Sequence, residues 1–211
     1  MIRFALAVMF AFGLAAPAFA EKAVLAGGCF WCIEADFESV AGVSNVVSGY
    51  TGGATENPTY KQVGRGGTGH FEAVEVTFDP ARVSYAEILR LFFRSVDPTD
   101  AGGQFCDRGD SYRTAIFVTN DAQKAVADAA KADAAKVLGR KIATPILDAA
   151  IFWKAEAYHQ DYAKGTSVVL TRNGPKKQAK AYEFYRTACG RDATVKRLWG
   201  ADAPFAAKYL K

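Results

Sequence analysis

Apolar and polar residues are arranged along the chain in short runs that predict strands. Four segments have the length and apolar content of strands: 23–26, 43–47, 71–78 and 112–118. In the third of them, Val74, Val76 and Phe78 alternate with Glu75 and Thr77. Because successive side chains of a strand point to opposite faces, this alternation predicts one buried face and one that is more polar.

Helical spacing of apolar residues predicts three helices between and after these strands: 30–40, 85–93 and 121–138. Ser84 and Glu87 form a capping box at the start of the second, and Gly139 ends the third. The resulting order, β-α-β-β-α-β, predicts an α+β fold. We expect a two-layer α/β plait with a ferredoxin-like core, helices packed on one face of a mixed sheet and extra C-terminal helices.

Glycine-rich segments predict loops at 48–53, 64–70 and 102–110. The second precedes a strand, whereas a phosphate-binding loop opens a helix, so no phosphate site is predicted there. The third places Cys106 beside Asp107. An edge strand interrupted by a proline is expected at 141–147, and a short helix at 155–162.

Residues 1–20 differ from the rest of the chain. Arg3 is followed by an almost unbroken apolar run and by Ala18-Phe19-Ala20, an A-x-A cleavage site. These features predict a secretory signal peptide and an exported protein, periplasmic or secreted, without a stable membrane span after cleavage; an uncleaved anchor is the alternative. Residues 21–211 are then expected to form a single domain, in which 176–211 is a C-terminal segment.

The charge of the chain gives no indication of a nucleic-acid partner. The formal net charge is +4 for 211 residues, and it falls by one unit when Arg3 is removed with the signal peptide. This excess is small, and no basic stripe is interleaved with aromatic residues.

Cys29 is the main candidate for chemistry. It follows Gly27-Gly28, where the chain must turn sharply from a strand into a helix, and glycine permits such a turn. Free N–H groups and the positive end of the helix dipole favour a thiolate at a helix start, so we predict a lowered pKa and a nucleophile. The alternative is a small buried apolar residue. Cys32, one turn later, makes a C-x-x-C pair.

The four cysteines permit two further interpretations in an exported protein. One is a binding module held by two structural disulfides, with no reactive thiol. The other is a zinc site, for which a single C-x-x-C is weak support. Its ligands would come from Cys29, Cys32, Cys106, Cys189, His70 and His159.

Glu72 is the second candidate. It falls on the apolar side of its strand, where burial raises a carboxyl pKa and makes a general acid available near neutral pH. Alternatively, Glu72 reaches solvent at the strand end. His70, beside a glycine-rich loop, fits a hydrogen-bonded structural role better than that of a ligand or base.

Four motifs together resemble the A-type peptide-methionine sulfoxide reductases, over the chain from the end of the signal peptide to about Tyr162. They are Gly28-Cys29-Phe30-Trp31, Gly49-Tyr50-Thr51-Gly52-Gly53, Asn57-Pro58-Thr59-Tyr60 and Thr68-Gly69-His70-Phe71-Glu72. The resemblance implies a two-layer plait that reduces the S epimer of methionine sulfoxide, free or in proteins. It also implies recycling by thioredoxin or a similar dithiol donor. We further expect no cofactor or metal, and a monomer.

The same resemblance implies the roles of the reacting residues. Cys29 would attack the sulfoxide sulfur and end as a sulfenic acid, while Glu72 would protonate the oxygen. Phe30 and Trp31 would form the pocket for the S-methyl group of the substrate.

Three other residues would complete the site on the same grounds. Tyr60 and Tyr112 would hydrogen-bond the sulfoxide oxygen, and Asp107 would order the site through water or a neighbouring side chain.

The resolving cysteine is left open among three candidates. The family commonly has glycine at the position of Cys32 and a resolving cysteine in a flexible glycine-rich tail, whereas Cys189 lies in an Ala-Cys-Gly-Arg context. We rank Cys189 first by position, then Cys106 because it adjoins Asp107, and then Cys32, which helix geometry restrains.

Overall fold

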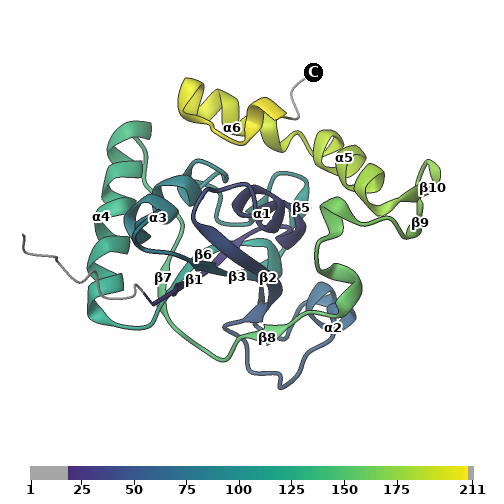
Figure 1. The fold of residues 1–211 in the computed structure, drawn as a ribbon, viewed down its shortest axis with the longest axis horizontal. Helices are drawn as coiled ribbons and strands as arrows, with labels where there is room; N and C mark the ends of the chain where they lie inside the picture. The colour runs from purple at the N-terminus through teal and green to yellow at the C-terminus, as the bar shows by residue number, and fades with distance from the viewer. Residues whose placement is uncertain (1–18, 209–211) are drawn as a thin grey trace, which may run out of the picture.

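The computed structural model describes residues 19–208, which are built around a six-stranded mixed sheet of order β7-β6-β1-β3-β2-β8 (Figure 1). Its strands are β1 (Glu21–Gly27), β2 (Val43–Thr51), β3 (Phe71–Phe78), β6 (Thr114–Val118), β7 (Ile146–Asp148) and β8 (Trp153–Lys154). Neighbouring strands are antiparallel except β6 and β7, which are parallel. The predicted signal peptide lies outside the described residues, apart from its last two.

Two crossover helices produce the predicted plait. α1 (Phe30–Phe37) connects β1 to β2, and α3 (Tyr85–Phe93) connects β3 to β6. The central strands therefore have the order β6-β1-β3-β2 with a β-α-β-β-α-β connection, so the predicted α+β plait is confirmed. α4 (Asp121–Leu138) packs beside α3 and ends at Gly139 in the left-handed conformation, as expected.

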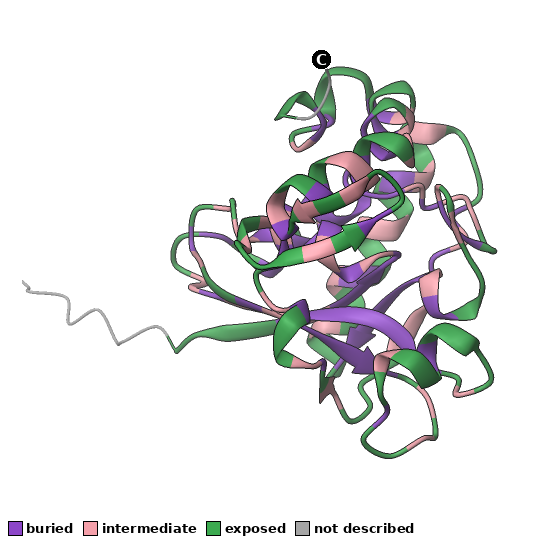
Figure 2. Ribbon diagram, turned by 90° about the vertical axis from the view of Figure 1, so that its right-hand side faces the viewer, coloured by how far each residue is buried: buried purple, intermediate pink, exposed green. Residues whose placement is uncertain are grey.

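Most residues of the central strands are buried (Figure 2), and an apolar cluster lies on each face of the sheet, one larger than the other. The main core lies between the sheet and the helices, where Leu25 and Val76 meet Ile33, Ile88 and other apolar side chains. A smaller cluster on the opposite face consists of Ala26, Phe71, Ala73, Ala115 and Phe117. The hydrophobic core therefore holds α1, and with it Cys29, against the sheet.

The C-terminal segment begins within β10 (Gly174–Lys177), which forms a two-stranded hairpin with β9 (Val168–Thr171). It contains α5 (Gln178–Ala188) and α6 (Arg191–Trp199), which lie above α1 in Figure 1 and are followed by two short 3-10 turns, 200–202 and 206–208. Val195 and Trp199 join the main core, and the Trp199 indole donates to the Val96 carbonyl over 3.4 Å. The segment is thus packed against the plait.

One predicted loop is part of a strand. Ser48 to Thr51 continue β2, because Thr51 pairs with Phe71 and Gly49 pairs with Lys154. A Cβ at Gly49 would lie 2.4 Å from the carbonyl oxygen of Trp153, so close strand approach explains this glycine. The prediction of a loop over 48–53 was wrong for its first four residues.

Three other segments differ from prediction in detail. Segment 102–110 contains a small hairpin of β4 (Gly103–Gln104) and β5 (Asp107–Arg108), and β6 begins at Thr114 after a 3-10 turn at 110–112. The edge strand at β7 begins only after Pro145, which lacks the N–H that a strand partner needs. Segment 155–162 forms a 3-10 turn at 157–159 and the start of another at 162–164, rather than an α-helix.

No helix among residues 19–208 is long and apolar enough to cross a membrane.

Candidate active site

All the side chains for which a role was predicted line one cavity of about 650 Å³. They are Cys29, Phe30, Trp31, Tyr60, Glu72, Asp107 and Tyr112, together with Cys32, Cys106 and Cys189. They come from β3 and from the starts of α1 and α2 (Tyr60–Arg65), as well as from the β4–β5 hairpin, the 3-10 turn before β6 and the end of α5. The fold therefore gathers residues that are spread over 160 positions of the sequence into one site.

Cys29 occupies the N-cap of α1, as predicted from the double glycine. Gly28 has φ of +80°, and a Cβ there would lie 2.5 Å from the Cβ of Gln104. A Cβ at Gly27 would lie 2.6 Å from Ile33. Both glycines are thus required for the turn that presents the half-buried Cys29 to the cavity.

The predicted lowering of the Cys29 pKa was wrong. A hydrogen bond with the Cys32 thiol raises the pKa of Cys29, and burial and the charges of Glu72 and Asp107 raise it further. The helix start does not compensate, because the N–H of Phe30 donates to Glu72 Oε2 over 3.1 Å. The backbone donor next to Cys29 is therefore bound to the Glu72 carboxyl group and not to the Cys29 sulfur.

Cys32 carries the thiolate character of the pair. The hydrogen bond from Cys29 lowers the pKa of Cys32 to about 7, against the opposing effect of its burial, and the positive charges of Arg191 and Arg186 contribute in the same direction. Because the two thiols are coupled, the loss of the first proton is a property of the pair and not of either cysteine alone. We expect the resulting negative charge to reside mainly on Cys32.

Glu72 lies on the helix-covered face of β3 and is only 1% exposed. This burial confirms the inference from strand alternation. Desolvation raises the pKa of Glu72 to about 8, and the charge of Asp107 raises it as well, although the hydrogen bond from Phe30 acts in the opposite direction. At neutral pH the carboxyl is therefore largely protonated and is available as a general acid beside Cys29.

Tyr60 and Tyr112 remain neutral hydroxyls beside this acid. Burial and the charge of Glu72 raise the pKa of both phenols, and the two side chains hydrogen-bond each other. Tyr112 also hydrogen-bonds Glu72. Tyr60 is the first residue of α2, whose capping box is formed by Thr59 and Gln62. That Thr-x-x-Gln pattern predicts a helix start at Tyr60, and the sequence analysis missed it.

Trp31 is held by Tyr162 and by His159, which was considered above only as a zinc ligand. Its ring is stacked on Tyr162 at a centroid distance of 3.7 Å and an angle of 8°. Its indole Nε1 donates to Nδ1 of the buried His159 over 3.1 Å. Burial lowers the pKa of His159 to about 4, so the ring is neutral and Nδ1 can accept.

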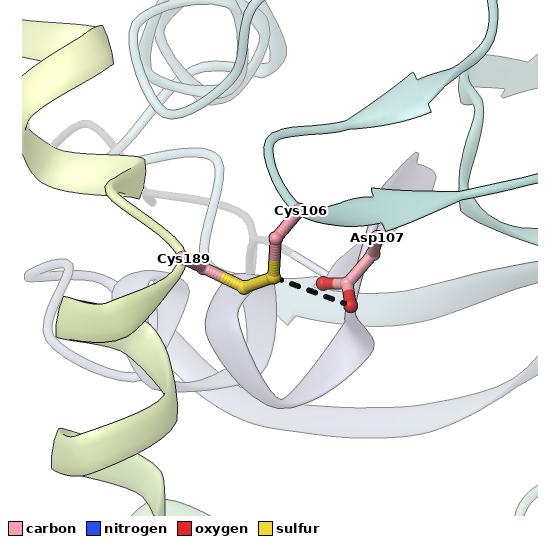
Figure 3. Close-up of a disulfide and its surroundings, with 3 residues drawn as sticks. All are labelled: Cys106, Asp107 and Cys189. Atoms are coloured by element: carbon pink, nitrogen blue, oxygen red, sulfur yellow. Dashed lines mark hydrogen bonds between the residues drawn. A yellow bond between two sulfur atoms is a disulfide. The ribbon is translucent and has the colours of Figure 1, made fainter.

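A disulfide joins Cys106 to Cys189, whereas Cys29 and Cys32 are free thiols (Figure 3). Cys106 Sγ lies 3.8 Å from Oδ1 of Asp107, which places this carboxyl next to both cysteine pairs. The first two candidates for the resolving cysteine are thus bonded to each other.

The only cluster of possible metal ligands among residues 19–208 is Cys106, Asp107 and Cys189, whose ligand atoms lie within 4.8 Å of one another. Two of the three are sulfurs of the disulfide, which has no thiolate to offer a metal. His70, considered above as a zinc ligand, hydrogen-bonds the backbone of Gly53 and Thr55 through its two ring nitrogens, in agreement with a structural role.

Two buried arginines of the C-terminal segment, Arg186 and Arg191, line the cavity. Arg186 donates to Asp36 over 2.8 Å and to Asp192 over 2.9 Å. Arg191 donates to the carbonyls of Gly27 and Ser95 over 3.2 and 3.0 Å. These cations come close to Cys32 through long-range contacts, so no local sequence pattern indicated them.

Comparisons with known proteins agree with this arrangement. A sequence model of the family described as peptide methionine sulfoxide reductase matches residues 21–201. The chain is 50% identical over 201 residues to peptide methionine sulfoxide reductase MsrA 2 of Caulobacter vibrioides, covering 93% of this chain and 94% of that protein. It is 49% identical over 180 residues to MsrA 2 of Rhizobium meliloti, covering 85% and 84%.

Solved structures show the same similarity. Mxr1 from Saccharomyces cerevisiae in reduced form is 31% identical, with a TM-score of 0.67, and covers 71% of this chain and 87% of that chain. Methionine sulfoxide reductase A of Corynebacterium diphtheriae is 30% identical, with a TM-score of 0.63, and covers 71% and 76%. With the site geometry and the matched family, these similarities show that the chain belongs to the A-type peptide methionine sulfoxide reductases.

Proposed function

We propose that this protein reduces the S epimer of methionine sulfoxide, free or in proteins, to methionine. The observation that carries the proposal is the pairing of a free thiol, Cys29, with a buried carboxyl, Glu72, at the start of α1. A sulfoxide oxygen leaves poorly until it is protonated, and a carboxyl with a pKa of about 8 supplies that proton at neutral pH.

The reaction uses the residues that line the cavity. The Cys29 sulfur attacks the sulfoxide sulfur, and the proton of Glu72 passes to the sulfoxide oxygen. Tyr60 and Tyr112 donate hydrogen bonds to that oxygen as charge develops on it. The thiol proton of Cys29 restores Glu72. The products are methionine and a Cys29 sulfenic acid, so one oxygen atom moves from substrate to enzyme.

The aromatic side chains give the substrate its orientation. Phe30 and Trp31 form an apolar wall for the S-methyl group, and Tyr162 and His159 fix the plane of the indole. Asp107 also lines the cavity, next to Cys106. We expect the orientation of the sulfoxide between the aromatic wall and the hydroxyls to select one epimer.

Regeneration requires a second thiol and an external dithiol. A thiol condenses with the sulfenic acid to form an intramolecular disulfide and water, and a thioredoxin-like donor then reduces a disulfide by thiol exchange. The Cys106–Cys189 bond supports such a cycle, because it shows that cysteines of this cavity pair with each other.

The test is methionine formation from each epimer of a methionine sulfoxide peptide and of the free amino acid, with the protein and a dithiol. We expect product from the S epimer only and none from Cys29→Ser. Product from the R epimer at a similar rate, or from Cys29→Ser, would contradict the proposal.

We also propose that residues 1–20 are removed as a signal peptide and that the protein acts as a monomer in the periplasm or outside the cell. The A-x-A site supports this, and the family match begins at residue 21. N-terminal sequencing of protein from cell fractions should find Glu21 first, and light scattering should give the mass of one chain. An intact N-terminus in the cytosol would contradict the export.

A further inference from the structure

The cavity extends beyond the residues that the proposed reaction uses. Its volume is about 650 Å³. At roughly 30 Å³ per non-hydrogen atom, the share of a water molecule in the liquid, a methionine sulfoxide side chain needs only roughly 150 Å³. One part of the cavity holds Cys29 and the groups that react with the sulfoxide. Another part is lined by Leu170 of β9 and by Phe184 and Tyr185 of α5, which have no role in that reaction.

We propose that this second part of the cavity binds a residue that neighbours methionine sulfoxide in a polypeptide substrate, and that it prefers a large apolar side chain there. We call the surface formed by Leu170, Phe184 and Tyr185 the flanking surface. The inference rests on the proposed reductase activity and adds to it a preference for the sequence around the oxidised methionine.

A run of aromatic rings connects the reacting part of the cavity to the flanking surface. The Trp31 ring is stacked on Tyr162 at 3.7 Å. Burial and the charge of Tyr185 raise the pKa of Tyr162, so these two phenols are neighbours. The rings of Phe184 and Tyr185 meet edge to face, with their centroids 5.3 Å apart. The wall that takes the S-methyl group therefore continues into the flanking surface.

The opening of the cavity lies beside the same surface. Most of the lining residues are buried or half-buried, and the exposed ones are Cys106, Leu170, Arg172 and Ala188. Leu170 and Arg172 belong to the β9–β10 hairpin, which lies next to the start of α5 in Figure 1. A polypeptide is too large to enter the cavity as a whole. When its methionine sulfoxide side chain reaches Cys29, its neighbouring residues must therefore lie at this rim.

The chemistry of the rim favours an apolar neighbour. Leu170 is 84% exposed, although it lies in a strand and is paired with Pro175 of β10. An apolar side chain seated on Leu170, Phe184 and Tyr185 removes apolar surface of both partners from water, which is favourable. Arg172, exposed at the same rim, adds a positive charge that repels a basic neighbour.

The experiment compares kcat/KM for a set of peptides with dithiothreitol as reductant, so that no protein donor takes part. The host peptide has glycine on both sides of the S epimer of methionine sulfoxide, and leucine or lysine replaces each of the nearest glycines in turn. With wild type, leucine at the preferred position should raise kcat/KM about tenfold through a lower KM, equivalent to about 1.4 kcal/mol. Lysine should give no gain at any position.

Leu170→Ser removes the exposed part of the flanking surface. The advantage of leucine over glycine should fall from about tenfold to about twofold, and Phe184→Ala should lower it from the α5 side. The matched control is Val168→Ser, which makes a similar change on the same strand. Val168 is 69% exposed but does not line the cavity, so this variant should keep the tenfold advantage.

Equal kcat/KM for the leucine, lysine and glycine peptides with wild type would overturn the proposal. A leucine advantage that survives in Leu170→Ser, or that Val168→Ser removes equally, would do the same.

Two further outcomes would assign the flanking surface to another occupant and also overturn the proposal. A loss in Leu170→Ser that appears only with a protein dithiol would indicate docking of the electron donor. A fall in mass from two chains to one in Leu170→Ser, measured by light scattering, would indicate a second copy of this chain. Absence of product from every peptide and from free methionine sulfoxide would instead reject the reductase activity itself, so the two failures are distinguishable.

Discussion

The two cysteine pairs of the cavity differ in how the chain produces them. Cys29 and Cys32 lie three positions apart on one helix, and the local backbone fixes their relation. Cys106 and Cys189 are 83 positions apart and meet only because the C-terminal segment packs on the plait. The inner pair is thus a property of the plait, whereas the outer pair also depends on the long-range contacts of α5 and α6.

This difference separates two requirements of the site. The inner pair must be shielded, because burial keeps Glu72 protonated beside Cys29. The outer pair must be accessible, because a protein donor has to reach it, and Cys106 is exposed. The two pairs that line the cavity thus differ in exposure as these two requirements differ.

The largest expected effect is a loss of catalytic activity when a cysteine of the inner pair, but not one of the outer pair, is replaced. Cys29→Ser should reduce kcat/KM by at least about 10³-fold, because a serine hydroxyl is not ionised and the covalent step is lost. Cys106→Ser should leave the first turnover unchanged in stopped-flow measurements. Equal losses in the two variants would remove the distinction between an inner reacting pair and an outer pair that does not take part in the first turnover.

Glu72→Gln should lower kcat by about 10²- to 10³-fold, because the amide cannot transfer a proton. The wild-type rate should fall as pH rises through about 8, where the carboxyl loses its proton, and this high-pH limb should be absent in Glu72→Gln. Persistence of the same limb in the variant would assign the titration to another group.

Arg186→Met tests whether buried ion pairs hold the C-terminal segment, which carries Cys189, on the plait. The change leaves Asp36 and Asp192 buried without their cation, so the free energy of unfolding should fall by about 3–5 kcal/mol in urea. The control Lys180→Met, which removes an exposed pair with Glu183, should change it by less than about 0.5 kcal/mol. Similar values for the two variants would contradict the structural role of Arg186.

The smallest effect concerns the wall of the inner site. His159→Leu leaves the Trp31 indole N–H without its acceptor, and we expect KM to rise about tenfold, equivalent to about 1.4 kcal/mol, with a smaller change in kcat. His159→Gln keeps an acceptor and should restore most of the affinity. A KM that is unchanged in His159→Leu would show that Trp31 needs no fixed orientation.

Local patterns in the sequence predicted most of the plait. The β3 alternation placed Glu72 on the buried face, and the double glycine placed Cys29 at a helix start. Local patterns failed where distant residues decide the outcome. The pKa of Cys29 depends on Glu72, which takes the N–H of Phe30, and no pattern around Cys29 reveals that competitor.

The same reason applies to the C-terminal segment. Helical spacing indicates α5, but it cannot show that Arg186 reaches Asp36 or that Cys189 meets Cys106. At Gly49 the local pattern was misleading. A glycine is typical of a loop, but Gly49 lies in a strand, where the carbonyl oxygen of Trp153 comes too close for a Cβ. For α2 a local indication was missed, the Thr59–Gln62 capping box.

The central claim is that Cys29 reduces one epimer of methionine sulfoxide and that cysteines of the same cavity take up the oxidation. The most direct measurement is a single addition of each epimer of a methionine sulfoxide peptide to fully reduced protein without reductant, with counts of methionine and remaining thiols. We predict product from the S epimer only, with two thiols lost for each methionine formed. If neither epimer yields methionine and all four thiols survive, the account is wrong.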